Sequence, residues 1–134
     1  MKKLIFLLCI FAGFLQVSMA ETYNDKISVG PCWNVNSLSE EALSITVTLQ
    51  FDMSKAGYPK TESIKLIEAS GGSSNAIQIA FQAARRAIQV CGSRGFDLQL
   101  EKYEEWKTIE MIFDPNPKCK KIEVLPGIFE GCDY

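Results

Sequence analysis

Apolar and polar residues alternate without exception over residues 43–51, from Leu43 to Phe51, and this pattern leaves few folds open. A period of two predicts a strand with one face in a core and the other in water, which is typical of antiparallel sheets. A loop follows over residues 52–57, and Pro59 bars an early return to a central ladder. The apolar residues within 62–69 then predict a second strand, so the first two strands form a hairpin.

A long amphipathic helix is predicted after residue 73. Ser73, Ser74 or Asn75 can cap its start, and Gly92 ends it. Its apolar residues recur at spacings of four and three, which places them on one stripe: Ile77, Phe81, Ala84, Ile88 and Cys91.

Alternation returns at residues 108–113, where apolar side chains predict a third strand that ends at Asp114-Pro115. Residues 101–106 suit one more helical turn, and the tail after residue 116 holds at most one short strand, at 122–125. The expected fold class is α+β, with a three-stranded antiparallel sheet packed on one long helix.

The first 20 residues have the organisation of a cleavable signal peptide. Lys2 and Lys3 precede an apolar run over residues 4–15, and Ser18-Met19-Ala20 offers small residues for cleavage. The run is shorter than the roughly 20 apolar residues that span a bilayer. We therefore expect an exported chain with no membrane span after cleavage, divided into a signal (1–20), a domain (21–117) and a tail (118–134).

Composition excludes several classes of function. The chain has no histidine, which removes His-dependent general bases and most zinc sites. Without Lys2 and Lys3 the basic residues number 12 against 16 acidic ones, so the mature net charge is −4. Such a domain lacks the positive surface of a nucleic-acid binder, and no cofactor is expected.

Four cysteines remain after cleavage: Cys32, Cys91, Cys119 and Cys132. An even number in an exported chain predicts disulfides, and three pairings are open. Cys32 and Cys91 can meet across the sheet, while Cys119 and Cys132 flank the tail. A metal site is the alternative, although the spacings are wide and no histidine contributes.

Three polar groupings have both a functional and a structural interpretation. Gly71-Gly72-Ser73-Ser74 precedes a helix as phosphate loops do, but it lacks the P-loop lysine, which favours a tight turn. Arg85 and Arg86 could grip a carboxylate, although such pairs more often form the solvent side of a helix. Four carboxylates could supply the acid pair of a hydrolase, but such a cluster more often forms a solvent-exposed face: Glu101, Glu104, Glu105 and Glu110.

Several segments, taken together over residues 27–117, resemble the C-terminal domain of TolA, the cell-envelope integrity protein, within the wider TonB C-terminal fold. No single motif decides the resemblance, and its most specific part is the run from Ala80 through Pro115, which includes the helical residues 80–88 and Cys91. The other matching segments are Cys32-Trp33-Asn34-Val35, Gly57-Tyr58-Pro59, Glu101-Lys102-Tyr103, Ile109-Glu110-Met111 and Phe113-Asp114-Pro115.

The resemblance implies a periplasmic adaptor rather than an enzyme, with partners such as TolB or Pal. It also implies that Cys32 pairs with Cys91, which leaves Cys119 for Cys132. The TolA family has an uncleaved anchor and a long spacer before this domain, whereas a cleavable signal leads into it here. We therefore expect a binding module of the Tol-Pal or TonB type, and energy transduction is in doubt.

The expected mode of binding is strand addition at a sheet edge. The strand over residues 108–113 is the favoured edge, with Thr108, Glu110 and Ile112 facing the partner. The alternative at this point is that the tail folds back and covers that edge. The alternative functions are a disulfide-stabilised exported inhibitor or toxin-like domain, and a carboxylate-dependent secreted hydrolase.

Overall fold

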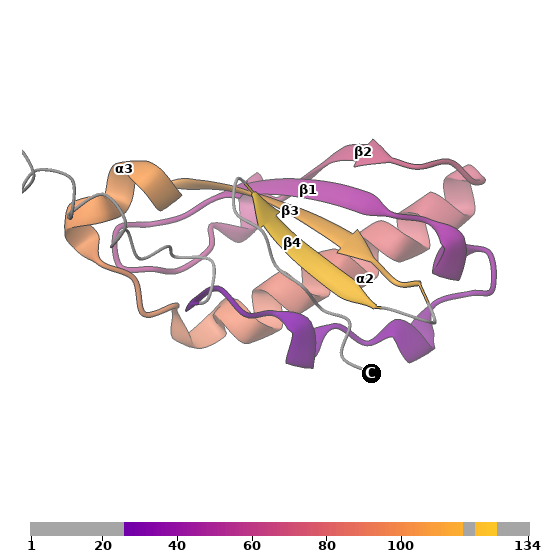
Figure 1. The fold of residues 1–134 in the computed structure, drawn as a ribbon, viewed down its shortest axis with the longest axis horizontal. Helices are drawn as coiled ribbons and strands as arrows, with labels where there is room; N and C mark the ends of the chain where they lie inside the picture. Colours follow the sequence, from indigo (N-terminus) through magenta and orange to yellow (C-terminus); the bar gives the residue numbers. More distant parts are fainter. Residues whose placement is uncertain (1–25, 117–119, 126–134) are drawn as a thin grey trace, which may run out of the picture.

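One long helix packs behind a twisted sheet in the computed structural model, which describes residues 26–116 and 120–125 (Figure 1). The helix is α2 (Ser74–Cys91), and a single further turn forms α3 (Tyr103–Trp106). The four antiparallel strands are β1 (Val47–Asp52), β2 (Lys65–Ala69), β3 (Thr108–Asp114) and β4 (Lys121–Leu125). They lie in the order β2-β1-β3-β4, so the α+β class is confirmed with four strands rather than three.

The first strand begins later than its alternating pattern suggests. Residues Ala42–Ser44 form a 3₁₀ turn, and β1 starts only at Val47. Local side-chain bonds hold that turn, since the Ala42 N–H donates to Ser39 Oγ and the Ser44 hydroxyl donates to the Glu41 carbonyl. Such bonds compete with a ladder, which explains why the strand is shortened at its start. The predicted hairpin of β1 and β2 is confirmed.

The third strand lies inside the sheet. β3 pairs with β1 from Thr108 to Phe113 and with β4 from Glu110 to Asp114. The chain stops pairing at Pro115 but comes back as β4, which turns Ile122 and Val124 into the core. The expectation that residues 108–113 form an edge strand is therefore wrong, and the alternative, in which the tail covers this edge, is correct for Lys121–Leu125.

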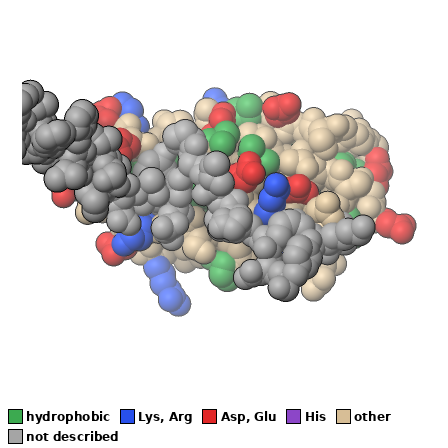
Figure 2. Space-filling view, viewed as in Figure 1, with side chains coloured by type: hydrophobic (Ala, Val, Ile, Leu, Met, Phe, Trp, Pro, Cys, Tyr) green, Lys and Arg blue, Asp and Glu red, His purple; other side chains and the backbone are tan. Residues whose placement is uncertain are grey.

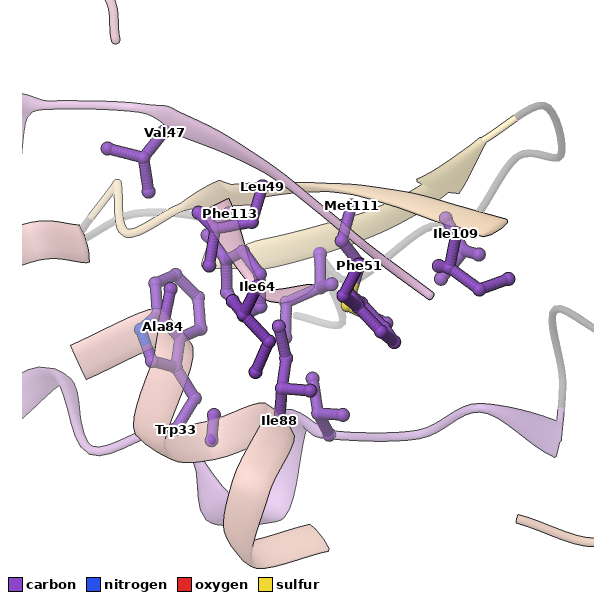
Figure 3. Close-up of a cluster of buried hydrophobic side chains, with 14 of the residues drawn as sticks. Trp33, Val47, Leu49, Phe51, Ile64, Ala84, Ile88, Ile109, Met111 and Phe113 are labelled. Carbon is purple, nitrogen blue, oxygen red and sulfur yellow. The ribbon is translucent and has the colours of Figure 1, made fainter. Parts of the chain in front are cut away.

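The buried face of α2 consists mainly of small residues: Ala76, Ala80, Ala84, Ala87 and Ile88. Ile77 and Phe81, expected on the buried stripe, are only partly buried. The chain before β1 fills the rest of the space under the sheet with side chains such as Trp33 and Leu38. The Trp33 ring meets Phe113 of β3 edge-on, with centroids 5.1 Å apart (Figure 3). Two segments therefore close the core beneath the sheet: the helix α2 and the irregular chain before β1.

A disulfide joins the chain before β1 to the end of α2. Cys32 and Cys91 are bonded, with their Cα atoms 5.8 Å apart and a sequence separation of 59 residues. This pairing, implied by the resemblance, is confirmed. Cys119 and Cys132 lie outside the described residues, as do the signal segment 1–20 and most of the tail. None of the helices in the described part combines the length and the apolar character needed to cross a bilayer.

Candidate functional site

β2 is one of the two edge strands of the described sheet, and its residues are more exposed than those of β4, the other edge strand. β2 pairs with β1 on one side, and no strand of the described residues lies on the other (Figure 1). Four of its five residues are exposed and Ala69 is half-buried, whereas each of the other three strands contains buried residues. Leu66 and Ile67 are 36% and 44% exposed. A strand edge with unpaired N–H and C=O groups and with apolar side chains is suited to receiving another strand.

The pairing with β1 fixes how the side chains of β2 are arranged. Leu66 lies opposite Leu49, which is fully buried, so it belongs to the core-facing side of the sheet. Lys65 and Glu68 lie opposite Gln50 and Thr48 on the outer side. The register shifts between these positions and leaves Ile67 without a partner on β1. Such a bulge bends and twists the edge, which limits non-specific pairing.

Two serine hydroxyls hold the ends of this edge. The Asp52 N–H donates to Ser63 Oγ at 2.8 Å, just before β2. Beyond its other end, the Thr46 N–H donates to Ser70 Oγ at 3.0 Å and the Ser70 N–H donates to the Thr46 carbonyl at 2.9 Å. The edge is therefore held in place before any partner arrives, which lowers the entropy cost of docking.

The three residues predicted to face a partner lie on the middle of the outer sheet face. Glu110 and Ile112 each pair with β1 on one side and β4 on the other, and Thr108 pairs with Asp52. The Thr108 hydroxyl also donates to the Asp52 carboxylate at 3.0 Å. In the view of Figure 2 hydrophobic side chains lie among acidic and basic ones. Strand addition at Glu110 and Ile112 therefore has no open strand edge to use, and that part of the hypothesis is corrected.

The four candidate carboxylates come from different elements. Glu101 lies in the 3₁₀ turn Leu100–Lys102, Glu104 and Glu105 lie on α3, and Glu110 lies on β3. Glu104 pairs with Lys107, and that hydrogen bond, helped by the negative charge, raises the pKa of Lys107. No group of three metal-ligating side chains occurs among the described residues.

The glycine-serine segment before α2 forms a capped turn. Ser73 Oγ accepts from the Ala76 N–H at 3.1 Å, which makes Ser73 the N-cap. The Glu41 carboxylate accepts from both the Ser73 N–H and the Ser73 hydroxyl. An anion of the chain itself therefore sits where a phosphate would bind, and the structural interpretation of this segment holds.

Comparisons with family models, with curated proteins and with solved structures found no match for this chain. The resemblance to the TolA domain therefore stays a prediction based on the residues that carry it. Sequence reasoning favoured β3 as the open edge because it comes last and is followed by Pro115, and the return of the chain as β4 could not be foreseen. The adjacent apolar residues Leu66 and Ile67 of β2 break the alternation of a regular strand. That adjacency, flanked by Lys65 and Glu68, is the signal that marks a bulged edge strand.

Proposed function

We propose that the mature chain is a periplasmic, non-enzymatic protein-binding module that receives an extended segment of a partner protein at β2. The observation that carries this proposal is the exposed outer edge of β2 with its apolar pair, Leu66 and Ile67. In strand addition the main chain supplies affinity through ladder hydrogen bonds, and alternate side chains supply specificity. This replaces β3 by β2 as the docking strand.

Two further observations support the location and the class of partner. The Cys32–Cys91 disulfide suits an oxidising compartment, as does the signal-like start of the chain. The resemblance to the TolA domain favours an adaptor of the cell envelope with a TolB-type or Pal-type partner. Neither the disulfide nor the edge calls for catalytic chemistry.

The side chains of β2 indicate what the partner segment carries. Leu66 offers an apolar contact on the core-facing side, so an apolar residue beside it gains buried area. Lys65 and Glu68 lie on the outer side, and a partner with the opposite charges at these positions is favoured over one with like charges. The segment is therefore a short strand with an apolar inner face and mixed charges outside.

The test replaces the apolar pair and measures partner binding by titration calorimetry. We expect Leu66→Lys with Ile67→Lys to raise the Kd for the TolB-type or Pal-type partner at least about tenfold, because two apolar contacts are lost. The matched control is Val90→Lys with Leu100→Lys, which removes two apolar residues elsewhere that are somewhat more exposed and adds the same charge. The control is expected to bind as the parent does.

Hydrogen exchange distinguishes strand addition from contact through side chains alone. Amides on the outer side of β2 become protected when a partner strand pairs with them. Equal binding by the folded edge variant and the parent would contradict the proposal, as would unchanged exchange in β2 at saturating partner. Failure of the parent to bind either partner would contradict the assignment to the Tol-Pal type.

A further inference from the structure

A hollow of about 650 Å³, which we call the polar hollow because most of the residues that line it are polar, lies between α2 and the chain around residues 32–37. Its volume falls in the range typical of ligand sites. The Cys32–Cys91 disulfide ties one wall to the end of the helix. Asn34 organises the same wall, since its side chain accepts from the Asn36 N–H at 3.1 Å and its carbonyl accepts from the Ser37 hydroxyl at 2.8 Å. The hollow is therefore held open by the fold itself.

Among the described residues, the charge around this hollow is positive and uncompensated. Arg85 and Arg86 both line it, and none of the described residues that line it carries a carboxylate. Within the part of the chain that the structure describes, the ion pairs are Lys107 with Glu104 and Lys121 with Glu123, so neither arginine is paired. Two guanidinium groups without an ion pair to any described residue, on a chain of net charge −2, mark the hollow as a place for an anion. The planar fork of arginine matches a carboxylate with two parallel hydrogen bonds.

Three glutamines extend the hollow along the helix. Gln78, Gln82 and Gln89 line it at spacings of four and seven residues, which places them on one side of α2. From the first to the last the helix rises about 16 Å, the length of about five residues of extended chain. Each amide both donates and accepts, as each peptide unit does. A phosphate or another small anion would use the donors alone and only part of this length.

We infer that the hollow binds an acidic, extended segment of a partner protein, about five residues long by these dimensions. Arg85 and Arg86 pair with its carboxylates, and the glutamines pair with its backbone N–H and C=O groups. This surface shares no residue with β2, so the inference does not depend on the function proposed above.

The experiment measures binding of a fluorescein-labelled pentaglutamate peptide by anisotropy at low ionic strength, with pentaglutamine as the uncharged probe. The oxidised protein is expected to bind the first and not the second. We expect Arg85→Gln with Arg86→Gln to raise the Kd at least about tenfold, because hydrogen bonds to charged groups are lost. The matched control, Lys60→Gln with Arg94→Gln, removes the same charge outside the hollow and should change the Kd less than about twofold.

The side-chain amide resonances of the glutamines report where the peptide lies. We expect those of Gln78, Gln82 and Gln89 to shift on titration with pentaglutamate, also in the variant with Leu66→Lys and Ile67→Lys. Equal weakening in the arginine variant and its control would overturn the inference, because long-range attraction then suffices. Displacement of the peptide by an equal concentration of inorganic phosphate, with no amide shifts, would reduce the hollow to a simple anion site. Absence of pentaglutamate binding would also overturn it.

Discussion

The Glu41 carboxylate accepts two hydrogen bonds from Ser73, one from its N–H at 2.8 Å and one from its hydroxyl at 3.0 Å. The same hydroxyl oxygen accepts from the Ala76 N–H, so the three residues form a chain of bonds at the start of α2. A negative charge at a helix N-terminus also interacts favourably with the helix dipole. The link joins the chain before β1 to the helix across 32 residues of sequence.

Removing either member of this cap should lower the free energy of unfolding. We expect a loss of about 1 kcal/mol for Ser73→Ala, which deletes the N-cap oxygen. Glu41→Ala should cost about 1 kcal/mol through its exposed, charge-assisted bonds. Because the two residues share bonds, the double variant should lose less than the sum of both. Urea unfolding measures all three, and Glu40→Ala serves as the control; strictly additive losses would contradict the coupling.

Gly92 is required by packing rather than by backbone conformation. Its φ is −85°, which any residue adopts, but an added Cβ would lie 2.4 Å from Pro59 Cγ. Alanine normally gains about 1 kcal/mol over glycine in a helix. Here overpacking of about 1–3 kcal/mol should outweigh that gain, so Gly92→Ala is expected to lower the melting temperature.

Gly30→Ala is the matched control, because nothing lies within 4 Å of the Cβ it would add. Its stability should stay within about 0.5 kcal/mol of the parent. Calorimetric melting of both variants decides the point. A melting temperature of Gly92→Ala at or above that of the parent would show that Pro59 moves aside freely.

The Cys32–Cys91 disulfide closes a long loop and should account for a large share of the stability. For the separation of 59 residues, restriction of the unfolded chain contributes about 4 kcal/mol. We expect Cys32→Ala with Cys91→Ala to lose about this much in urea unfolding. Reductant should destabilise the parent more than this variant, and equal sensitivity of the two would mean that another bond carries the effect.

The corrected place of β3 leads to a prediction about β4. Val124 is buried, and an aspartate there must leave the core. Detachment of β4 is the local way to expose it, so Val124→Asp should speed amide exchange in β3 and β4 at least about tenfold. Glu123→Gln, on the outer side, is the control. Exchange that rises in β4 alone would mean that something else protects β3.

The elements of this fold could be predicted from sequence where each has its own strong pattern. The alternation of apolar and polar residues around Val47 and Met111 identified β1 and β3, and the helical spacing of apolar residues after Ser73 identified α2. The order of the strands could not be predicted, because it depends on how the chain returns after Pro115. The open edge was therefore assigned to β3 instead of β2, and the candidate docking residues changed with it.

The buried face of α2 shows a second limit of sequence patterns. Large apolar residues dominate a periodicity analysis, so the predicted buried stripe was centred on Ile77 and Phe81. The structure instead buries Ala76, Ala80 and Ala87, because small residues let the helix approach β1 closely. The side chains of Trp33 and its neighbours fill the remaining volume, and their packing against α2 cannot be predicted from the sequence of the helix.

This close approach predicts that size, rather than polarity, limits the centre of α2. Ala84 is fully buried under the sheet, among Leu49, Phe51 and Phe113 of the same core (Figure 3). We expect Ala84→Leu to cost about 2 kcal/mol or more, because three added carbons must displace packed neighbours. Ala83→Leu, one residue earlier, is the control: Ala83 is half-buried and lines the polar hollow, where space is free. Urea unfolding should separate the two clearly, with the control within about 0.5 kcal/mol of the parent. If both leucine variants lose the same free energy, the helix does not approach the sheet as closely as its alanine face indicates.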